Sequence, residues 1–488
     1  MAGVREWRDP SEEDRGRFDP RAIFEAGLRN HHIANTAYPI AHERTWRPYR
    51  VPRVGVASTV VRAWQGIRDL GLYVHVPFCE TRCSFCEYTV TRRSEHGGAE
   101  DYVAALLGEL ELYEDVIGTE GRLLHGLDIG GGTPSFLPAE AIARILSSVR
   151  ACFRFAPGSD ISIETTPKIA ASDPDKLTAY RRSGIDRISM GIQVIEPDLL
   201  RVLNREENGV GVHRRAVSNV RAAGFERLNL DLMYGFSGQS LDSWRATLEH
   251  AIGLGPEYIT LYRMRYKLTR ISHQAAHVTL DDVRPMAALA KEVLADAGYR
   301  ASPGKTTYSR IPADVGTSSY LARRVIEGMP YLGLGLGAQS FTHTTISYND
   351  GAAGKNLAPY LKSAREGRLP IQDLYDLPAV QMMGKMCSVS FYFGEIHLAA
   401  FAAKFGVSLD TAYPEAVAFL LREGLMEVRG AVLGLTSRGV EHKNGVHALF
   451  YAPSIQRYLL ERDPERAQDM TRHRRQAART ADEELVHV

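Results

Sequence analysis

The feature that most limits how this chain can fold is a regular alternation of β-prone and amphipathic runs, which begins at Leu70. Strands that alternate with helices are typical of repeated βα units around a parallel sheet. Six units are too few to close an eight-stranded barrel, so we predict an α/β fold with a partial, TIM-like (β/α)6 barrel that is curved and partly open. The predicted strands are residues 72–78, 126–130, 161–165, 187–193, 228–233 and 258–265, and the clearest helices are 100–115, 139–152, 241–252 and 283–297.

Three of the five cysteines follow the first predicted strand in a C-x3-C-x2-C array made by Cys79, Cys83 and Cys86. The strand thus delivers three thiolates into one loop. A structural zinc site would need four ligands in paired motifs, and no second C-x2-C or H-x3-H pair lies nearby. A disulfide framework needs an even cysteine count and a secreted chain. The array therefore predicts an iron–sulfur site with these cysteines as metal ligands.

A [4Fe–4S] cluster normally takes four thiolates, so three ligands leave one iron open. An open iron can chelate the amino and carboxylate groups of S-adenosylmethionine (SAM), and electron transfer into the sulfonium then yields a 5′-deoxyadenosyl radical. The stretch from Tyr73 to Glu87 closely resembles the radical SAM motif. The two remaining cysteines, Cys152 and Cys387, are interpreted as buried single thiols.

Composition argues against several other classes of protein. Lys and Arg number 59 against 58 Asp and Glu, a net charge of +1, so neither nucleic acid nor a membrane is expected as a partner. The first residues are charged and no run of about eighteen apolar residues occurs, so we expect neither a signal peptide nor a transmembrane helix. The chain is expected in the cytosol, where reduced thiols suit an oxygen-sensitive cluster.

Polar or glycine residues follow almost every predicted strand, and the ends of parallel strands meet at one edge of a sheet. The glycine run from Gly130 to Gly132 can let the backbone approach a ligand closely and offer its N–H groups. Glu164, Gln193 and Asp231 stand at the ends of the next three strands. A structural hydrogen bond explains any one of them as well as a ligand contact does. Their shared location predicts that a ligand fills the open end of the barrel at which these strands end.

The rest of the chain is predicted to flank this barrel. The run 331–341 is strand-like and rich in glycine, but it lacks the helix start and downstream acid of a dinucleotide-binding fingerprint. The extension before the barrel is rich in Arg, His, Pro and aromatic residues, and its sequence does not separate a lid over a cavity from a segment that packs on its neighbour. The predicted parts are an N-terminal extension (1–69), the barrel (70–345), a connector (346–374), a C-terminal unit (375–455) and a polar tail (456–488).

The C-terminal unit is predicted to be a small winged-helix-like domain. Helices near 379–388, 396–405 and 414–423 precede two short strands at 424–429 and 432–436. This shape often binds DNA, but no basic recognition helix is visible, so a packing or substrate-covering role is favoured. The tail is expected to be a solvated helix or a disordered end.

The motifs together resemble the oxygen-independent coproporphyrinogen III oxidase family of radical SAM proteins, over roughly residues 68–345 and more weakly through the C-terminal unit. The matching stretches are Y-V-H-V-P-F-C-E-T-R-C-S-F-C, G-G-G-T-P-S-F-L, S-I-E-T-T-P, R-I-S-M-G-I-Q, L-N-R-E, N-L-D-L-M-Y-G and L-G-L-G-A-Q-S-F. The resemblance implies a radical SAM barrel in which a [4Fe–4S] cluster and two SAM molecules lie together.

The same resemblance implies roles for individual residues. His75 is expected beside the cluster, where a neighbouring group tunes potential and ligand orientation. The cluster-bound SAM is expected to contact Tyr73, Gly131, Glu164 and Gln339, and the second SAM is expected to contact Phe85, Gly132, Thr133, Gln193, Arg205, Asp231 and Arg265.

Two positions depart from the members of that family that decarboxylate porphyrinogens. Those members carry a further cysteine two residues after the third cluster ligand, where this chain has Tyr88, and a tyrosine and alanine contact where this chain has the charged run 262–267. Relatives without the extra cysteine include the class C radical SAM methyltransferases and cyclopropane-forming enzymes. In these enzymes a methylene from the second SAM adds to an sp2 carbon.

We therefore predict transfer of a one-carbon unit, as methyl or as a cyclopropane methylene, to an unsaturated carbon of a small-molecule substrate. The electron donor is expected to be a protein such as flavodoxin or ferredoxin. One alternative is a porphyrinogen decarboxylase or porphyrin-modifying enzyme. The other is a haem chaperone, which only the N-terminal histidines support.

Overall fold

A computed structural model describes residues 7–30, 38–92, 98–266 and 269–462 of the chain. By internal contacts the chain divides into a larger unit, Val51–Asp376, and a smaller unit made of Met1–Arg50 and Leu377–Val488. The described residues leave out several that the sequence analysis considered: His31 and His32 of the extension, Lys267 of the charged run, and the tail from residue 463. The finer division at residues 69 and 345 stays a prediction.

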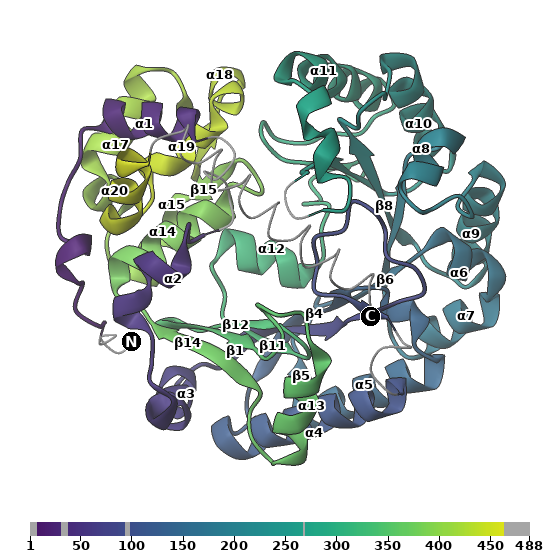
Figure 1. Cartoon of the computed structure of the whole chain (residues 1–488), viewed down its shortest axis with the longest axis horizontal. Helices are drawn as coiled ribbons and strands as arrows, with labels where there is room; N and C mark the ends of the chain where they lie inside the picture. The colour runs from purple at the N-terminus through teal and green to yellow at the C-terminus, as the bar shows by residue number, and fades with distance from the viewer. Residues whose placement is uncertain (1–6, 31–37, 93–97, 267–268, 463–488) are drawn as a thin grey trace, which may run out of the picture. The chain divides into compact units, whose positions relative to one another are not determined.

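The larger unit contains a 12-stranded mixed sheet with the order β10-β9-β8-β7-β6-β4-β1-β11-β12-β13-β14, and β5 pairs with β4 (Figure 1). Strands β1, β4, β6, β7, β8 and β9 run parallel to one another, as repeated βα units require, and β10 pairs antiparallel with β9. The α/β class is confirmed, and the closure of these strands into a partial barrel stays a prediction. The strands are β1 (Asp69–Val76), β4 (Leu123–Gly131), β5 (Arg154–Phe155), β6 (Ile161–Thr165), β7 (Arg187–Gln193), β8 (Arg227–Tyr234), β9 (Tyr258–Arg263), β10 (Thr307–Ser309), β11 (Tyr331–Leu334), β12 (Gln339–Phe341), β13 (Thr345–Asn349) and β14 (Ile371–Asp376).

The first strand ends two residues earlier than predicted. Pro77 follows Val76 and has no backbone N–H to give to a neighbouring strand. The next two residues form a separate strand, β2 (Phe78–Cys79), which pairs with β3 (Thr91–Arg92). The cysteine array therefore begins in this small second sheet.

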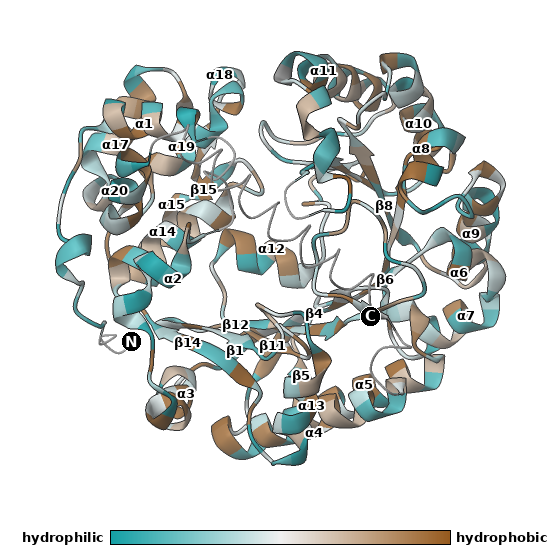
Figure 2. Cartoon of the chain, in the orientation of Figure 1, coloured by the Kyte–Doolittle hydropathy of each residue, from teal (hydrophilic) through white to brown (hydrophobic). Residues whose placement is uncertain are grey.

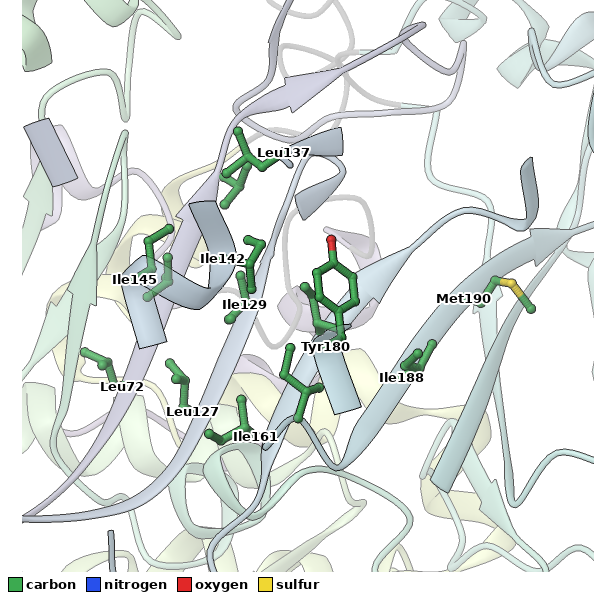
Figure 3. Packing of buried hydrophobic residues seen from close by; sticks show 14 of the residues in the cluster. Leu72, Leu127, Ile129, Leu137, Ile142, Ile145, Ile161, Tyr180, Ile188 and Met190 are labelled. Atoms are coloured by element: carbon green, nitrogen blue, oxygen red, sulfur yellow. The ribbon is translucent and has the colours of Figure 1, made fainter. Parts of the chain in front are cut away.

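One face of the parallel strands packs on helices. Side chains alternate between the two faces of a strand, so Leu72 and Ile129 share one face, where they pack with Ile142 and Ile145 of α5 (Figure 3). Figure 2 shows hydrophobic and hydrophilic sides on the helices that provide this cover. They are α3 (Val56–Trp64), α4 (Ala99–Ile117), α5 (Ala139–Cys152), α6 (Pro167–Ser172), α7 (Pro174–Arg182), α9 (Val210–Ala222), α10 (Leu241–Gly253), α11 (Leu280–Asp296) and α13 (Leu357–Arg365). Helix α12 (Ser319–Ile326) packs on the opposite face, where a Cβ at Gly71 would meet Tyr320, and α8 (Pro197–Val202) belongs to a separate apolar cluster.

The last part of the larger unit returns to the first strand. Strand β11 pairs in parallel with β1, so β1 has a partner on both sides although it comes first in the chain. Residues 346–374, expected as a connector, contain α13 and most of β13 and β14. The sheet thus extends beyond the six predicted βα units.

A buried carboxyl group ties α4 to this returning part of the chain. Glu109 accepts hydrogen bonds from the Gly335 N–H (2.8 Å), the Asn349 amide (2.6 Å) and the Tyr360 hydroxyl (2.7 Å). Tyr102 lies about two turns before Glu109 in α4. Its hydroxyl donates to the carbonyl of His75 in β1 and accepts from the Leu336 N–H. Burial raises the pKa of Glu109 to about 7, despite these three donors.

The smaller unit joins both ends of the chain. Gln381 lies at its centre: its amide N–H donates to Asp14, and its amide oxygen accepts from Tyr38 and Trp46. The described N-terminal residues thus pack on the C-terminal helices. The helices are α1 (Pro20–Arg29), α2 (His42–Thr45), α14 (Ala379–Ser390), α15 (Leu398–Phe405), α16 (Leu409–Ala412), α17 (Pro414–Arg422), α18 (Ser437–Glu441), α19 (Lys443–Leu449) and α20 (Pro453–Glu461).

The sheet of the smaller unit has three strands in the order β15-β17-β16, not the two that were predicted. Strands β16 (Met426–Arg429) and β17 (Val432–Leu435) form the predicted hairpin, and β15 (Glu395–His397) adds to its edge. The prediction assigned residue 396 onward to a helix, because Ile396 continues the apolar pattern of α15 (Leu398–Phe405). Among the described residues, no helix is both long enough and apolar enough to span a bilayer.

Candidate functional site

The three cysteines of the array lie in the loop that follows β1. Burial raises the pKa of Cys79 to about 12, and the nearby Cys83 and Cys86 thiols raise it too, while a hydrogen bond from Thr133 lowers it. Burial also raises the pKa of Cys86, with Cys83 again contributing. The three thiols are therefore close enough to repel one another once ionised, and a bound cationic group would relieve that repulsion.

The donor set fits an iron–sulfur cluster better than a single metal ion. Within the described ranges, no three His, Cys, Asp or Glu side chains are gathered as ligands of one ion. A cluster needs no such gathering, because each thiolate binds a different iron. When bound, it supplies the electron that cleaves SAM to a 5′-deoxyadenosyl radical.

The glycine run supports the cysteine loop. The Gly132 N–H donates to the carbonyl of Val76 (2.8 Å) and the Thr133 N–H to that of Phe78 (2.8 Å). A Cβ at Gly132 would lie 2.7 Å from the Phe78 oxygen, so only glycine fits. The Thr133 hydroxyl donates to Cys79 Sγ (3.6 Å). The sequence suggested that this run offers its N–H groups to a ligand. In this structure the N–H groups of Gly132 and Thr133 instead bind backbone carbonyls of the chain itself.

The residues predicted for the cluster-bound SAM lie on adjacent strands. The Gly131 N–H donates to Glu164 Oε2 (3.2 Å). A Cβ at Gly130 would lie 2.9 Å from Glu164 and 3.2 Å from the ring of Tyr73, so the three residues meet. Tyr73 also pairs in register with Gly333 of β11, whose other neighbour, Gln339, begins β12. The Gln339 amide oxygen accepts from the Tyr331 hydroxyl.

Three carboxyl groups face the same side of these strands, opposite the packed helices. Glu164 remains accessible to solvent, but burial and the nearby Asp231 raise the pKa of its carboxyl to about 7. Burial raises the pKa of Asp128 to about 7 and that of Asp231 to about 6. Asp231 accepts from Asn229 (2.8 Å) and Ser189 (3.3 Å).

Arg187 is the cation whose charge acts on all three of these carboxyl groups. Arg187 donates to Ser162 Oγ (3.3 Å), and its guanidinium lies 5.3 Å from the centre of the Tyr258 ring. Its charge lowers the pKa of all three carboxyl groups, yet burial outweighs it. Arg324 also lowers the pKa of Asp128, and Arg205 lowers that of Asp231, so acidic and basic side chains are mixed on this face.

The residues predicted for the second SAM meet around Gly191. This glycine pairs in register with Asp231, and a shift of register follows before Gln193. Arg205 donates to the Gly191 carbonyl (2.5 Å) and to Cys83 Sγ (3.3 Å), and so joins this wall to the cysteine loop.

Two further residues predicted for the second SAM lie on the margins of this group. Phe85 packs against an apolar cluster formed after β7, β8 and β9, with its ring 6.5 Å from that of Phe236. Arg265 lies 3.8 Å from Glu87, an ion pair that holds it beside the cysteine loop.

Gln193 combines a strained backbone with an unpaired polar atom. Its φ is +71°, which side-chain-bearing residues rarely adopt. Its amide oxygen is buried and has no hydrogen-bond partner in the described part of the chain. Both features cost stability and persist only where the surroundings impose them, which makes Gln193 a strong candidate for ligand contact.

We expect Gln193→Gly to bind SAM more weakly without loss of stability. Glycine removes the amide but accepts the positive φ, so the free energy of unfolding should stay level or rise by about 1 kcal/mol. SAM affinity should fall roughly tenfold, the value of one hydrogen bond to a charged ligand. Calorimetry and urea denaturation measure the two quantities. Gln193→Ala keeps the backbone strain, so it should be less stable than Gln193→Gly. Unchanged SAM affinity in Gln193→Gly would contradict the assignment of Gln193 to ligand contact.

Sequence reasoning missed Asp128 and Arg187 as site residues. Both belong to predicted strands, and Arg187 opens one of the quoted motifs. A signal was present in the sequence. Asp128 lies two residues before Gly130 of the glycine run, and Arg187 lies six residues before the predicted site residue Gln193. Alternation along a strand places such residues on one face. His75, predicted beside the cluster, donates its Nε2–H to the Thr89 carbonyl (2.8 Å), and burial lowers its pKa to about 4.

Comparison with known proteins identifies the family of the chain. A family model for the radical SAM superfamily matches residues 73–251, and one for the HemN C-terminal domain matches residues 393–442. An oxygen-independent coproporphyrinogen III oxidase of Cereibacter sphaeroides is 30% identical over 368 residues, which cover 71% of this chain and 77% of that protein. The heme chaperone HemW of Mycobacterium tuberculosis is 34% identical over 199 residues, 40% of this chain.

The chain spans about half the length of the curated heme chaperones that it matches, 50% for the protein of M. tuberculosis. The solved structure of coproporphyrinogen III oxidase (HemN) from Escherichia coli has the same fold, with a TM-score of 0.70 and 23% identity over 85% of this chain and 96% of that one. The chain therefore belongs to the radical SAM superfamily and, within it, to the HemN-like family that includes the oxygen-independent coproporphyrinogen III oxidases.

Proposed function

We propose that this chain is a radical SAM enzyme that modifies a porphyrin or porphyrinogen. The observation that carries the proposal is the match to the coproporphyrinogen III oxidase of C. sphaeroides, which extends over 77% of that protein. The relatives support this alternative better than transfer to an unspecified small molecule, because their names refer to coproporphyrinogen or heme. The site supports it through three thiols in one loop and a set of buried carboxyl groups on the adjoining strands.

In this proposal the side chains of the site bind and orient, and the cofactors supply the reactivity. Cys79, Cys83 and Cys86 hold the cluster. Glu164 would accept an N–H of the amino group of a SAM bound there, since its carboxylate lies beside Gly130 and Tyr73 and receives the Gly131 N–H. The apolar cluster around Phe236 excludes water from one side of the site.

A second SAM is part of the proposal. Gln193, Arg205 and Asp231 would bind it, since they meet at Gly191 and include a buried amide oxygen without a partner. A low-potential protein such as flavodoxin or ferredoxin is proposed as the electron donor.

One-carbon transfer is the second candidate, and Tyr88 favours it. This residue stands two positions after Cys86, where the resemblance places a cysteine in decarboxylating members, and its side chain is 64% exposed. Beside it, Arg265 of the charged run pairs with Glu87. A porphyrin has many sp2 carbons, so the two candidates can share a substrate class and differ in the reaction.

Methyl-deuterated SAM distinguishes the candidates. The reconstituted full-length protein is incubated anaerobically with a low-potential reductant and coproporphyrinogen III, and in parallel with haem. If a substrate propionate gives up the hydrogen, 5′-deoxyadenosine carries no deuterium and carbon dioxide is released. If the second SAM gives it up, deuterium appears in 5′-deoxyadenosine and S-adenosylhomocysteine accumulates.

Two outcomes would count against the proposal. The protein could bind haem stoichiometrically and yet yield neither the decarboxylated nor the methylated product from any tetrapyrrole. That result would point to a haem chaperone. Turnover confined to an alkene that is not a tetrapyrrole would restore one-carbon transfer to another small molecule. Cys152→Ala is the matched control, because its thiol lies outside the array and contacts Glu114 (3.4 Å).

A further inference from the structure

Lys355 reaches the cysteine loop from a distant part of the sequence. It lies in the loop between β13 and α13, where its backbone has a φ of +52°. Its ammonium group donates to the carbonyls of Glu87 (2.7 Å) and Tyr88 (3.0 Å), the two residues after the last cysteine of the array. Its own N–H bonds to the Gly351 carbonyl (2.9 Å), which fixes the loop that presents it.

The two carbonyls that Lys355 holds belong to a segment that contacts cysteine sulfur. The Tyr88 N–H donates to Cys86, and this hydrogen bond lowers the pKa of the thiol. Arg82 donates to the Cys86 carbonyl from the other side (3.3 Å). Lys355 thus keeps in place the peptide group whose N–H meets the third predicted metal ligand.

Lys355 also brings charge to this ligand. Both Arg82 and Lys355 lower the pKa of the Cys86 thiol, so both cations lie within electrostatic range of its sulfur. Glu87 is the opposing charge nearby, and it is shared with Arg265. Lys355 is partly buried, and burial lowers its pKa, with Arg82 adding to this effect.

We propose that Lys355 is a positioning residue that holds the Glu87 and Tyr88 peptides against Cys86 and stabilises the reduced form of the cluster by its charge. A [4Fe–4S]²⁺ core with three thiolates carries one net negative charge, and the electron it takes from a low-potential donor adds a second. A nearby cation and an N–H to sulfur both favour the more negative state and so raise the reduction potential. The inference rests on the cluster alone and not on the porphyrin substrate.

The test is a reductive titration of the full-length protein, reconstituted anaerobically and measured without SAM or substrate. Dithionite sets the solution potential, and electron paramagnetic resonance reports the reduced cluster. In Lys355→Met the ratio of reduced to oxidised cluster at a fixed potential should fall roughly tenfold, which is about 59 mV for a one-electron couple. Lys355→Arg keeps the charge and two donors, so it should titrate as the natural protein does.

Lys362→Met is the matched control, because Lys362 lies on the exposed side of α13 and pairs only weakly with Glu366 (3.8 Å). Iron and sulfide analysis shows how much cluster each variant holds. If Lys355→Met holds too little for titration, Lys355→Gln carries the same measurement, since it keeps a donor without the charge. A midpoint unchanged in the neutral variant, or shifted equally in Lys355→Arg, would contradict the proposal whatever the enzyme's substrate is.

Discussion

Replacement of Cys83 by Ala is expected to abolish the iron–sulfur chromophore and the cleavage of SAM. Cys83 is the second of the three cysteines in the sequence of the array, and its sulfur accepts a hydrogen bond from Arg205 (3.3 Å). Mutation of a residue that merely orients a metal ligand typically costs 10- to 100-fold in affinity or activity. Loss of a ligand itself should exceed that, so 5′-deoxyadenosine formation should fall by more than about a hundredfold.

The measurement is absorbance near the cluster band together with chromatographic assay of 5′-deoxyadenosine after anaerobic reconstitution. Cys79→Ala and Cys86→Ala should behave as Cys83→Ala does. Cys152→Ala should leave both signals unchanged, because Cys152 lies on α5 outside the array. Undiminished SAM cleavage in Cys83→Ala would show that the array is not the cluster site.

Asp231→Asn should separate SAM cleavage from formation of the coupled product. Asp231 faces the proposed second SAM, and asparagine keeps its size while removing its charge. A hydrogen bond to a charged group contributes about 1.5–3 kcal/mol, so the affinity of that site for SAM should fall roughly 10- to 100-fold. Glu164 and the cysteines remain, so 5′-deoxyadenosine should still form while the coupled product disappears.

The assay compares the yields of 5′-deoxyadenosine and of product from the same reaction. Asp242→Asn is a suitable control, since Asp242 is exposed in the first turn of α10. If Asp231→Asn lost the cluster while remaining folded, the assignment of this residue to the second SAM would be wrong. Equal loss of both products would place Asp231 at the cluster-bound SAM instead.

The parallel core of the fold could be predicted from sequence because its pattern is strong. Strands β6 and β7 have the predicted bounds, and α5 does as well. Their apolar residues recur with a clear period, and glycine or proline marks their ends. The return of β11 to β1 could not be predicted, because pairing between residues 71 and 331 leaves no trace in local pattern.

The sequence indicated the candidate site residues whose chemistry is unusual, but it did not indicate those that only their position brings to the site. A triple cysteine array is rare enough to identify a cluster from sequence alone. Arg187 and Asp128 are ordinary residues, and only their place on the inner face of the sheet makes them part of the site. Lys355 is even harder to predict, because it contacts Glu87, beside the array, from 268 residues away in the sequence. The loop that presents it matches no sequence motif.

The position of β1 between β4 and β11 determines where the chain can be shortened. The stretch that matches the superfamily model ends at residue 251, which makes it a tempting boundary for a minimal catalytic fragment. Such a fragment would lack β11, so the strand that leads into the cysteines would become an open edge prone to aggregation. It would also lack Gly335, Asn349 and Tyr360, and would leave the Glu109 carboxyl buried without donors. Expression of an active fragment therefore requires residues through Asp376, the end of the larger unit.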